Sequence, residues 1–116
     1  MKIIKSFGFA IEGIIYAIRS QLNLRIHLFG LLIMNCSSFY FRFTKMELIV
    51  SILSATMVIA FELINTAIES CVDLTTEEWK PLAKVAKDCA AGGVLVCSIS
   101  ALVIWGIIVF GKLTVS

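Results

Sequence analysis

Residues 61–74 read FELINTAIESCVDL, and this stretch decides the fold class of the chain. It closes an apolar run that begins at Met46, yet it contains Glu62, Asn65, Glu69 and Asp73. At about 100° per residue of α-helix, these four positions lie within an arc of roughly 80°. The stretch therefore predicts one long helix that is apolar around most of its circumference and carries a single polar stripe.

The composition indicates an integral membrane protein. Of the 116 residues, 59% are hydrophobic, and the mean hydropathy of +0.99 is far above that of soluble globular chains. A helix needs about 20 apolar residues to cross a hydrocarbon core of about 30 Å. We expect transmembrane helices at residues 28–43, 46–68 and 90–111, although the first is short and polar in places. The length allows one all-α domain over residues 1–116, and no nucleic-acid partner is expected.

Residues 1–20 predict an amphipathic helix on the membrane surface. Their apolar side chains recur with a helical period on one face, and the charged side chains lie on the other. A secretory signal is the alternative for such an N-terminus, but Glu12 and Arg19 interrupt the pattern and no cleavage site follows. A helix of this kind is expected to lie in the interface rather than to cross the bilayer.

The distribution of basic residues predicts the orientation of the chain. Lysines and arginines precede the first expected span and recur in the loop and helix start at residues 74–88. The opposite ends of the spans carry only Arg42, Lys45 and Lys112. Under the positive-inside rule, the N-terminus and the second loop are then cytoplasmic, where ATP is available.

Several residues with chemical potential are interpreted as structural. His27, at the start of the first expected span, is read as an interfacial anchor rather than a catalyst. Trp105 is expected to pack between helices. The cysteines follow no metal-ligand spacing, so we expect packing rather than a disulfide or a zinc site at Cys36, Cys71, Cys89 and Cys97.

The polar stripe predicts chemistry at membrane depth. An acid inside the bilayer costs several kcal/mol unless it is paired, solvated or bound to a cation, so Glu62 is a functional candidate. The next helix start, PLAKVAKDCAAGG at residues 81–93, adds Lys87 and Asp88 and then small residues that permit close approach. The structural alternative is an ion pair between Glu69 and Lys87, with the small residues serving helix packing alone.

Phosphoryl transfer would use all of these groups. It needs a cation, a lysine on the phosphates and a base aimed at the acceptor hydroxyl. Mg²⁺ prefers carboxylate and phosphate oxygens as ligands. Because the candidate base lies below the interface, the acceptor hydroxyl is expected to belong to a lipid whose tail stays in the bilayer.

ELINTAIESCVDL (62–74) followed by PLAKVAKDCAAGGVL (81–95) resembles the small prokaryotic diacylglycerol kinase family, which includes the undecaprenol kinases of Gram-positive bacteria. SFGFAIEGIIYAIRSQLNLRIH (6–27) also resembles the family's amphipathic helix and re-entry segment. The resemblance implies a homotrimer of three-span subunits in the bacterial cytoplasmic membrane. Its active sites lie between neighbouring chains and use ATP and Mg²⁺.

The resemblance also implies a role for each matching residue. Glu62 matches the base that takes the lipid hydroxyl proton, with Ala91 beside the lipid. Glu69 matches a ligand of the metal and of ATP, supported by Asn65 and Asp73. Further nucleotide contacts are implied at Glu78, Trp79, Lys80, Lys87 and Asp88.

Two residues depart from the family pattern. Gln21 stands where a glutamate usually joins Glu69 in holding the metal and ATP, and Phe9 stands where a tyrosine commonly contacts ATP. An amide oxygen can still coordinate Mg²⁺, but a negative charge is lost. The departures predict either a weakened metal site or a member that has lost catalysis.

Substrate and class leave alternatives open. The PLAK segment resembles the undecaprenol kinases more than the proteobacterial diacylglycerol kinases, so undecaprenol is expected, with diacylglycerol as the alternative. A small oligomeric proton-coupled carrier, in which Glu62 binds a proton, is the rival of another class. Such a carrier has no need of a second acid on the stripe or of the lysine–aspartate pair.

Overall fold

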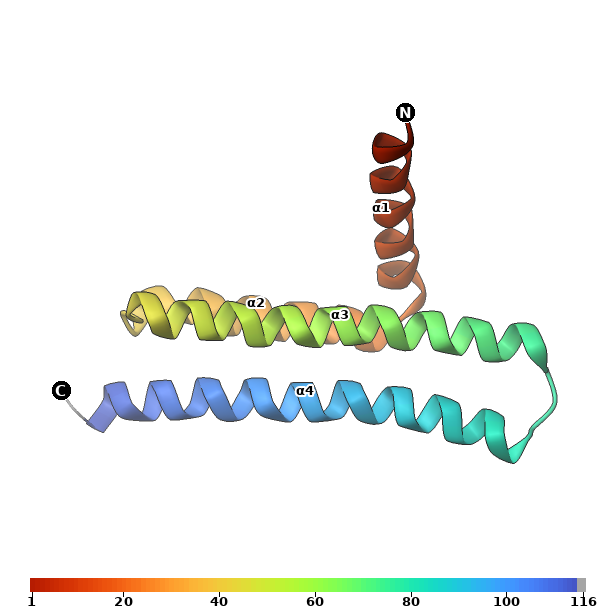
Figure 1. Ribbon diagram of the computed structural model, residues 1–116. Helices are drawn as coiled ribbons and strands as arrows, with labels where there is room; N and C mark the ends of the chain where they lie inside the picture. Colours follow the sequence, from red (N-terminus) through yellow and green to blue (C-terminus); the bar gives the residue numbers. More distant parts are fainter. Residues whose placement is uncertain (115–116) are drawn as a thin grey trace.

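The computed structural model describes residues 1–114, and within that range it contains four α-helices and no strand (Figure 1). The helices are α1 (Lys2–Ser20), α2 (Leu22–Tyr40), α3 (Lys45–Thr75) and α4 (Pro81–Thr114). α3 and α4 run antiparallel side by side, α2 packs against α3, and α1 projects sideways from this bundle (Figure 1). The all-α fold class is confirmed.

Local sequence explains where the helices begin and where the chain reverses. Arg42 adopts the left-handed conformation, with φ 54°, in the turn between α2 and α3. Thr44 then caps α3, because its side chain accepts a hydrogen bond from the Glu47 backbone N–H and the Glu47 carboxylate accepts one from the Thr44 N–H. Pro81 opens α4, as the sequence predicts, since its missing N–H has no partner to lose there.

The bundle has a narrow core because it is only three helices wide. Its central cluster consists of Leu31 from α2, Ala55 and Val58 from α3, and Ala101 from α4. Nearer the loop, α3 and α4 approach closely at Gly93, where an added Cβ would lie 3.1 Å from Cδ1 of Phe61. Small side chains at these contacts allow the two longest helices to stay together along their length.

Two of the four helices, α3 and α4, are long and apolar enough to cross a membrane. With 31 and 34 residues, they measure about 46 and 51 Å at 1.5 Å per residue. Both exceed a hydrocarbon core of about 30 Å, so their ends reach beyond it. α2 is not one of these two candidates; it begins at Leu22, before the expected first span, and carries Arg25 and His27 near its start.

Three polar residues in the second half of α2, namely Asn35, Ser37 and Ser38, lie towards its neighbours. Ser51 of α3 donates a hydrogen bond to Oδ1 of Asn35 at 3.1 Å, and Trp105 of α4 donates from Nε1 to Ser37 at 2.9 Å. Ser38 is buried. The polar groups that lower the hydropathy of this expected span are thus hydrogen-bonded inside the bundle. Trp105 packs between helices, as predicted.

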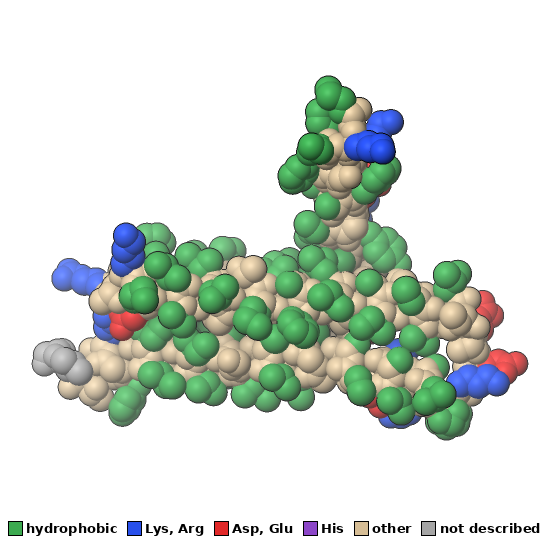
Figure 2. Space-filling view, viewed as in Figure 1, with side chains coloured by type: hydrophobic (Ala, Val, Ile, Leu, Met, Phe, Trp, Pro, Cys, Tyr) green, Lys and Arg blue, Asp and Glu red, His purple; other side chains and the backbone are tan. Residues whose placement is uncertain are grey.

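α1 presents its apolar residues to the surroundings. Ala17 is its buried residue, whereas Ile3, Ile4 and Phe7 are each at least 67% exposed. Figure 2 shows apolar side chains on α1 and along the flanks of the bundle, while charged side chains gather towards the two ends of the bundle. The exposed apolar surface is typical of a chain whose helices contact lipid or further protein. The four cysteines are free thiols.

Candidate active site

The polar stripe of α3 runs from the bundle interior to the end of the helix. Glu62 is 2% exposed and Asn65 is 8% exposed. Glu69 is half-buried and Asp73 is exposed. All four lie on one uninterrupted helix, so the stripe reaches from a dry environment to a wet one.

Glu62, the deepest carboxylate, is paired with a histidine. Nδ1 of His27 on α2 lies 2.5 Å from Oε1 of Glu62, and Nε2 of His27 lies 3.4 Å from Oγ of Ser98 on α4. A cavity of about 260 Å³ adjoins the pair, and Ala91 and Asn65 are among its lining residues. The acid therefore faces a space that can receive a small polar group.

His27 is interpreted from the sequence as an interfacial anchor, but the structure places it between Glu62 and Ser98 in the bundle. Leu24 and Leu31 of α2 are buried, and His27 lies three residues after the first and four before the second. Residues at this spacing share one helix face. A polar residue between two inward-facing leucines is the sequence signal that could have placed His27 inside the bundle.

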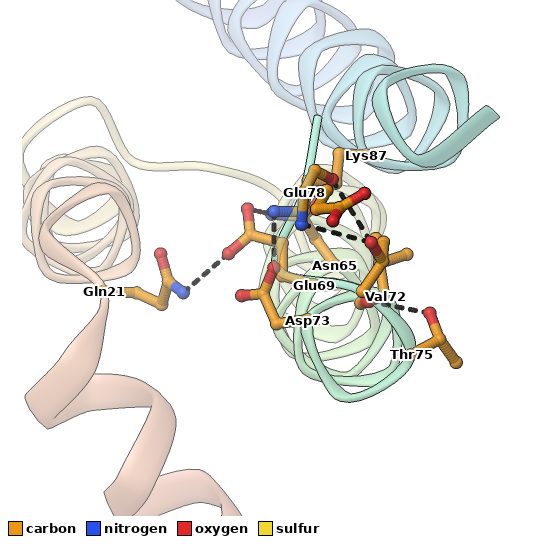
Figure 3. A network of polar contacts seen from close by, with 9 residues as sticks. Gln21, Asn65, Glu69, Val72, Asp73, Thr75, Glu78 and Lys87 are labelled. Atoms are coloured by element: carbon orange, nitrogen blue, oxygen red, sulfur yellow. Dashed lines mark hydrogen bonds and ion pairs between the residues drawn. The ribbon is translucent and has the colours of Figure 1, made fainter. Parts of the chain in front are cut away.

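Gln21, at the junction of α1 and α2, contacts Glu69 (Figure 3). Its Nε2 donates a hydrogen bond to Oε2 of Glu69 at 3.0 Å, and Nδ2 of Asn65 donates to Oε1 at 3.4 Å. Oδ1 of Asn65 is buried and has no hydrogen-bond partner among the described residues. Such an atom costs about 1–3 kcal/mol unless a bound molecule supplies a donor.

Glu69 and Gln21 offer the ligand type that Mg²⁺ prefers. Mg²⁺ is held by one or two carboxylates together with phosphate oxygens and water. Residues 1–114 contain no group of three His, Cys, Asp or Glu placed to hold a metal without help. The donor set thus fits a cation that arrives with phosphate. Gln21 turns its nitrogen towards Glu69, so its amide has to rotate before its oxygen can join.

A second cavity, of about 370 Å³, lies at the α3–α4 loop. It is lined by most of the residues expected to contact nucleotide, namely Glu78, Trp79, Lys80, Lys87 and Asp88, together with Asp73. Figure 3 shows Lys87 close to the stripe of α3. Three lysines border the cavity, since Lys84 also lines it, beside four acidic residues that include Glu77. The lysines can donate to phosphate oxygens, but the lining as a whole has no excess of positive charge.

Lys87 pairs with Asp73 rather than with Glu69. Its Nζ donates to Oδ1 of Asp73 at 2.6 Å, while Lys84 pairs with Asp88 at 2.5 Å. The hydrogen bond to Asp73 raises the pKa of Lys87 above its ordinary value. The ammonium group is therefore charged throughout the physiological range, and it is available to phosphate at the cost of one exposed ion pair.

Phe9 is the predicted site residue that the chain does not bring to the others. It is 68% exposed on α1, and the chain from Phe9 to Gln21 covers about 18 Å of helix. α1 leads away from the bundle (Figure 1), and Phe9 does not line the cavity beside Glu62 or the cavity at the loop.

These features define an all-helical protein with two candidate membrane spans, a histidine-paired acid at depth, and a carboxylate–lysine site at the bundle end. Residues 8–109 match the family model for prokaryotic diacylglycerol kinase. A diacylglycerol kinase of Synechocystis is 42% identical over 103 residues, which cover 87% of this chain and 58% of that protein. The undecaprenol kinase of Bacillus subtilis is 36% identical over 91% of this chain and 85% of its own length.

A third relative, the diacylglycerol kinase of Haemophilus influenzae, is 31% identical over 93% of this chain and 92% of its own length. The chain belongs to the prokaryotic diacylglycerol kinase family, as its motifs indicate. The names of its relatives are those of lipid kinases, which makes the family one of lipid kinases. This chain spans 58% of the Synechocystis protein, and most of the other two.

Proposed function

We propose that this protein transfers the γ-phosphoryl group of ATP, in the presence of Mg²⁺, to the hydroxyl group of a membrane lipid. The observation that carries the proposal is the placement of Glu62. It is 2% exposed on a helix long enough to span a membrane, it adjoins a cavity, and it shares one stripe with Glu69. A base at this depth is suited to an acceptor whose tail lies in the bilayer.

In this function each group has a separate role. Glu62 takes the proton of the lipid hydroxyl as its oxygen attacks the γ-phosphorus. Glu69 and Gln21 would hold Mg²⁺, which offsets phosphate charge when bound. Lys87 contacts the phosphates, together with groups of the loop cavity that include Lys80.

The substrate we favour is undecaprenol, with diacylglycerol as the second candidate. The PLAK segment at residues 81–84 supports undecaprenol. The 42% identity to a protein named diacylglycerol kinase supports the second candidate, against 36% for the undecaprenol kinase. The two lipids share a hydroxyl at the interface and differ in the tail, so they are tested side by side.

We further propose that α2 is the third span and that the N-terminus faces the cytoplasm of the bacterial inner membrane. The internal pairing of Asn35 and Ser37 supports burial of α2 in the bilayer. The hydrogen bond from Gln21 to Glu69 supports a common side for the α1–α2 junction and the loop end of α3. Basic residues are concentrated at that end, as the positive-inside rule requires. α1 would then lie in the interface.

A homotrimer is the proposed assembly, with each site shared between neighbouring chains. The family resemblance is its main support. The exposed apolar flanks of α3 and α4 offer surface for contacts between the chains.

The function is tested by a lipid-phosphorylation assay. Purified full-length protein is mixed with γ-labelled ATP, Mg²⁺ and either undecaprenol or dioleoylglycerol in mixed micelles. We expect label in the lipid fraction, and the lipid labelled faster names the substrate. Undecaprenyl acetate, which has the tail without the hydroxyl, serves as the matched control. Absence of label from both alcohols would overturn the proposal, and it would leave the carrier or a catalytically silent member.

A further inference from the structure

His27 occupies a position that the motifs of the chain do not assign to catalysis. It is the single histidine of the sequence, and it stands between Glu62 on α3 and Ser98 on α4. The imidazole side chain is 32% exposed, whereas the Glu62 side chain is 3% exposed. The histidine therefore connects a nearly dry carboxylate to a wetter part of the cavity.

The hydrogen bonds fix which nitrogen of His27 carries a proton. The Ser98 hydroxyl donates to the backbone oxygen of Val94 at 2.8 Å, so its one proton is already used. Towards His27 the hydroxyl can only accept, which places a proton on Nε2. The contact between Nδ1 and Oε1 of Glu62 then contains one further proton, shared by the histidine and the acid.

Other charged groups lie away from this pair. The polar residues that line the cavity are Asn23, His27, Glu62, Asn65 and Ser98, and of these only His27 and Glu62 have ionisable side chains. Arg25, the nearest cation on α2, donates to the carbonyl oxygens of Ile18 and Arg19 at 2.9 Å and so points to α1. On α4 the facing residues are uncharged, and on α3 the next acid, Glu69, is engaged by Gln21.

We infer that His27 is a positioning residue for Glu62, which holds the carboxylate in one orientation and keeps it able to accept the proton of the lipid hydroxyl. The inference rests on the proposed lipid kinase function. With one carboxylate oxygen held by Nδ1, the other is left to face the cavity and the substrate. The contact with Nδ1 also gives a hydrogen-bond partner to a carboxylate that is nearly shielded from water.

The proton balance of the step is simple. The lipid O–H bond breaks and its proton moves to the free carboxylate oxygen of Glu62. At the same time a bond forms between the lipid oxygen and the γ-phosphorus, and the bond from that phosphorus to the β-bridging oxygen breaks and releases ADP. The pair then carries one extra proton, which leaves to water through the cavity before the next turnover.

The first test detects the contact between His27 and Glu62 without measuring catalysis. Because the chain has one histidine, ¹⁵N-histidine labelling gives one set of ring resonances in detergent micelles. We expect Nε2 to be protonated, and we expect the Nδ1 resonance to move in Glu62→Gln but not in Glu47→Gln, an acid-to-amide change at the far end of the same helix. If the Nδ1 resonance has the same chemical shift in Glu62→Gln as in the wild type, the inference is wrong.

The second test separates positioning from a merely structural role. In His27→Ala we expect kcat for lipid phosphorylation to fall about 10²-fold, with the KM for ATP nearly unchanged. His27→Asn places an amide nitrogen near the position of Nδ1, so it should recover part of kcat. Its kcat–pH profile should differ in shape from the wild type, since an amide does not titrate. Equal kcat and equal pH profiles in the wild type and His27→Asn would count against the role.

The two proposals can fail separately. If the wild type phosphorylates neither lipid but the histidine resonance responds to Glu62→Gln, the pair exists and the kinase function is wrong. If the lipid is labelled and both His27 variants retain wild-type kcat, the kinase function stands and the positioning role is wrong. Should His27→Ala fail to fold, His27→Asn and the resonance test decide the question.

Discussion

Gln21 and Glu69 face each other across the junction of α1 with the bundle, with the amide nitrogen 3.0 Å from Oε2 of the carboxylate. Forty-eight residues separate them in the chain. Gln21, which departs from the family pattern, therefore contacts Glu69, the proposed metal ligand, directly. The contact also gives the metal proposal a sharp test, because an acid at position 21 would lie beside a carboxylate instead of donating to it.

We predict that Gln21→Glu lowers the Mg²⁺ concentration for half-maximal activity roughly tenfold, which corresponds to about 1.4 kcal/mol. Two facing carboxylates bind a divalent cation more tightly than one carboxylate and an amide, and they repel each other when it is absent. Mg²⁺ titration of lipid phosphorylation measures the effect, with Gln21→Ala as the uncharged control. An unchanged Mg²⁺ requirement would exclude Gln21 from the metal site.

Glu62→Gln should reduce turnover at least 10²-fold while leaving nucleotide affinity within about a factor of two. The amide keeps the size of the side chain but cannot take a proton, and Glu62 is not one of the residues that line the loop cavity. Initial rates and the binding of a fluorescent ATP analogue give the two quantities. Glu47→Gln, which changes an acid at the far end of α3, should retain activity. Normal turnover by Glu62→Gln would show that the base lies elsewhere.

Lys87→Gln should raise the KM for ATP by roughly ten- to a hundredfold, because a charged hydrogen bond to phosphate is lost. Lys112→Gln provides the control, since Lys112 pairs with Glu47 at the opposite end of the bundle. The KM values of the two variants, measured at saturating lipid, give the comparison. A similar KM in both variants would remove Lys87 from the nucleotide site.

The protonation of Lys87 has a defined pH dependence. Asp73 raises the pKa of Lys87, so the contribution of the charged lysine to stability is complete below its ordinary pKa. It is lost only as the pH rises through the higher folded value. Lys87 therefore stays charged between pH 6 and pH 9, about the working range of such assays. Any pH dependence of the KM for ATP in this range should be the same in the wild type and in Lys87→Gln.

Gly92 and Gly93 form a matched pair for helix packing. An added Cβ at Gly92 meets no atom within 4 Å, whereas at Gly93 it would lie 3.1 Å from the Phe61 ring. We expect Gly92→Ala to stabilise α4 by up to about 1 kcal/mol through helix propensity, and Gly93→Ala to gain less or to lose stability because the ring must move. Thermal unfolding in detergent compares them. Equal stability of the two variants would indicate that the contact at Gly93 is unimportant.

If α2 crosses the membrane as the third span, the N-terminus and the α3–α4 loop lie on one side and the α2–α3 turn lies on the other. In a cysteine-free background, Ser6→Cys and Glu77→Cys should react with a membrane-impermeant thiol reagent from the same side, and Lys45→Cys from the other. Labelling of intact cells and of inverted vesicles measures the sides. If α2 does not cross, Ser6→Cys will instead label with Lys45→Cys.

Much of the candidate site follows from the sequence because it lies on one helix. Glu62, Asn65 and Glu69 share a face through the helical repeat alone, and no packing partner is needed to predict it. The start of α4 at Pro81 is local in the same sense. The apolar length of α3 and α4 likewise predicts their capacity to cross a membrane.

Only the tertiary structure decided which groups meet between helices. It paired Lys87 with Asp73 instead of Glu69, turned Asn35 towards Ser51, and placed His27 against Glu62. Hydrogen bonds within the backbone fix the spacing of residues along a helix, but they leave the rotation of that helix about its axis undetermined. That rotation is chosen by how side chains of neighbouring helices interdigitate, which depends on residues far apart in the chain. The sequence therefore determined which residues share a helix face, and the packing of α2 and α4 on α3 determined what each of those residues touches.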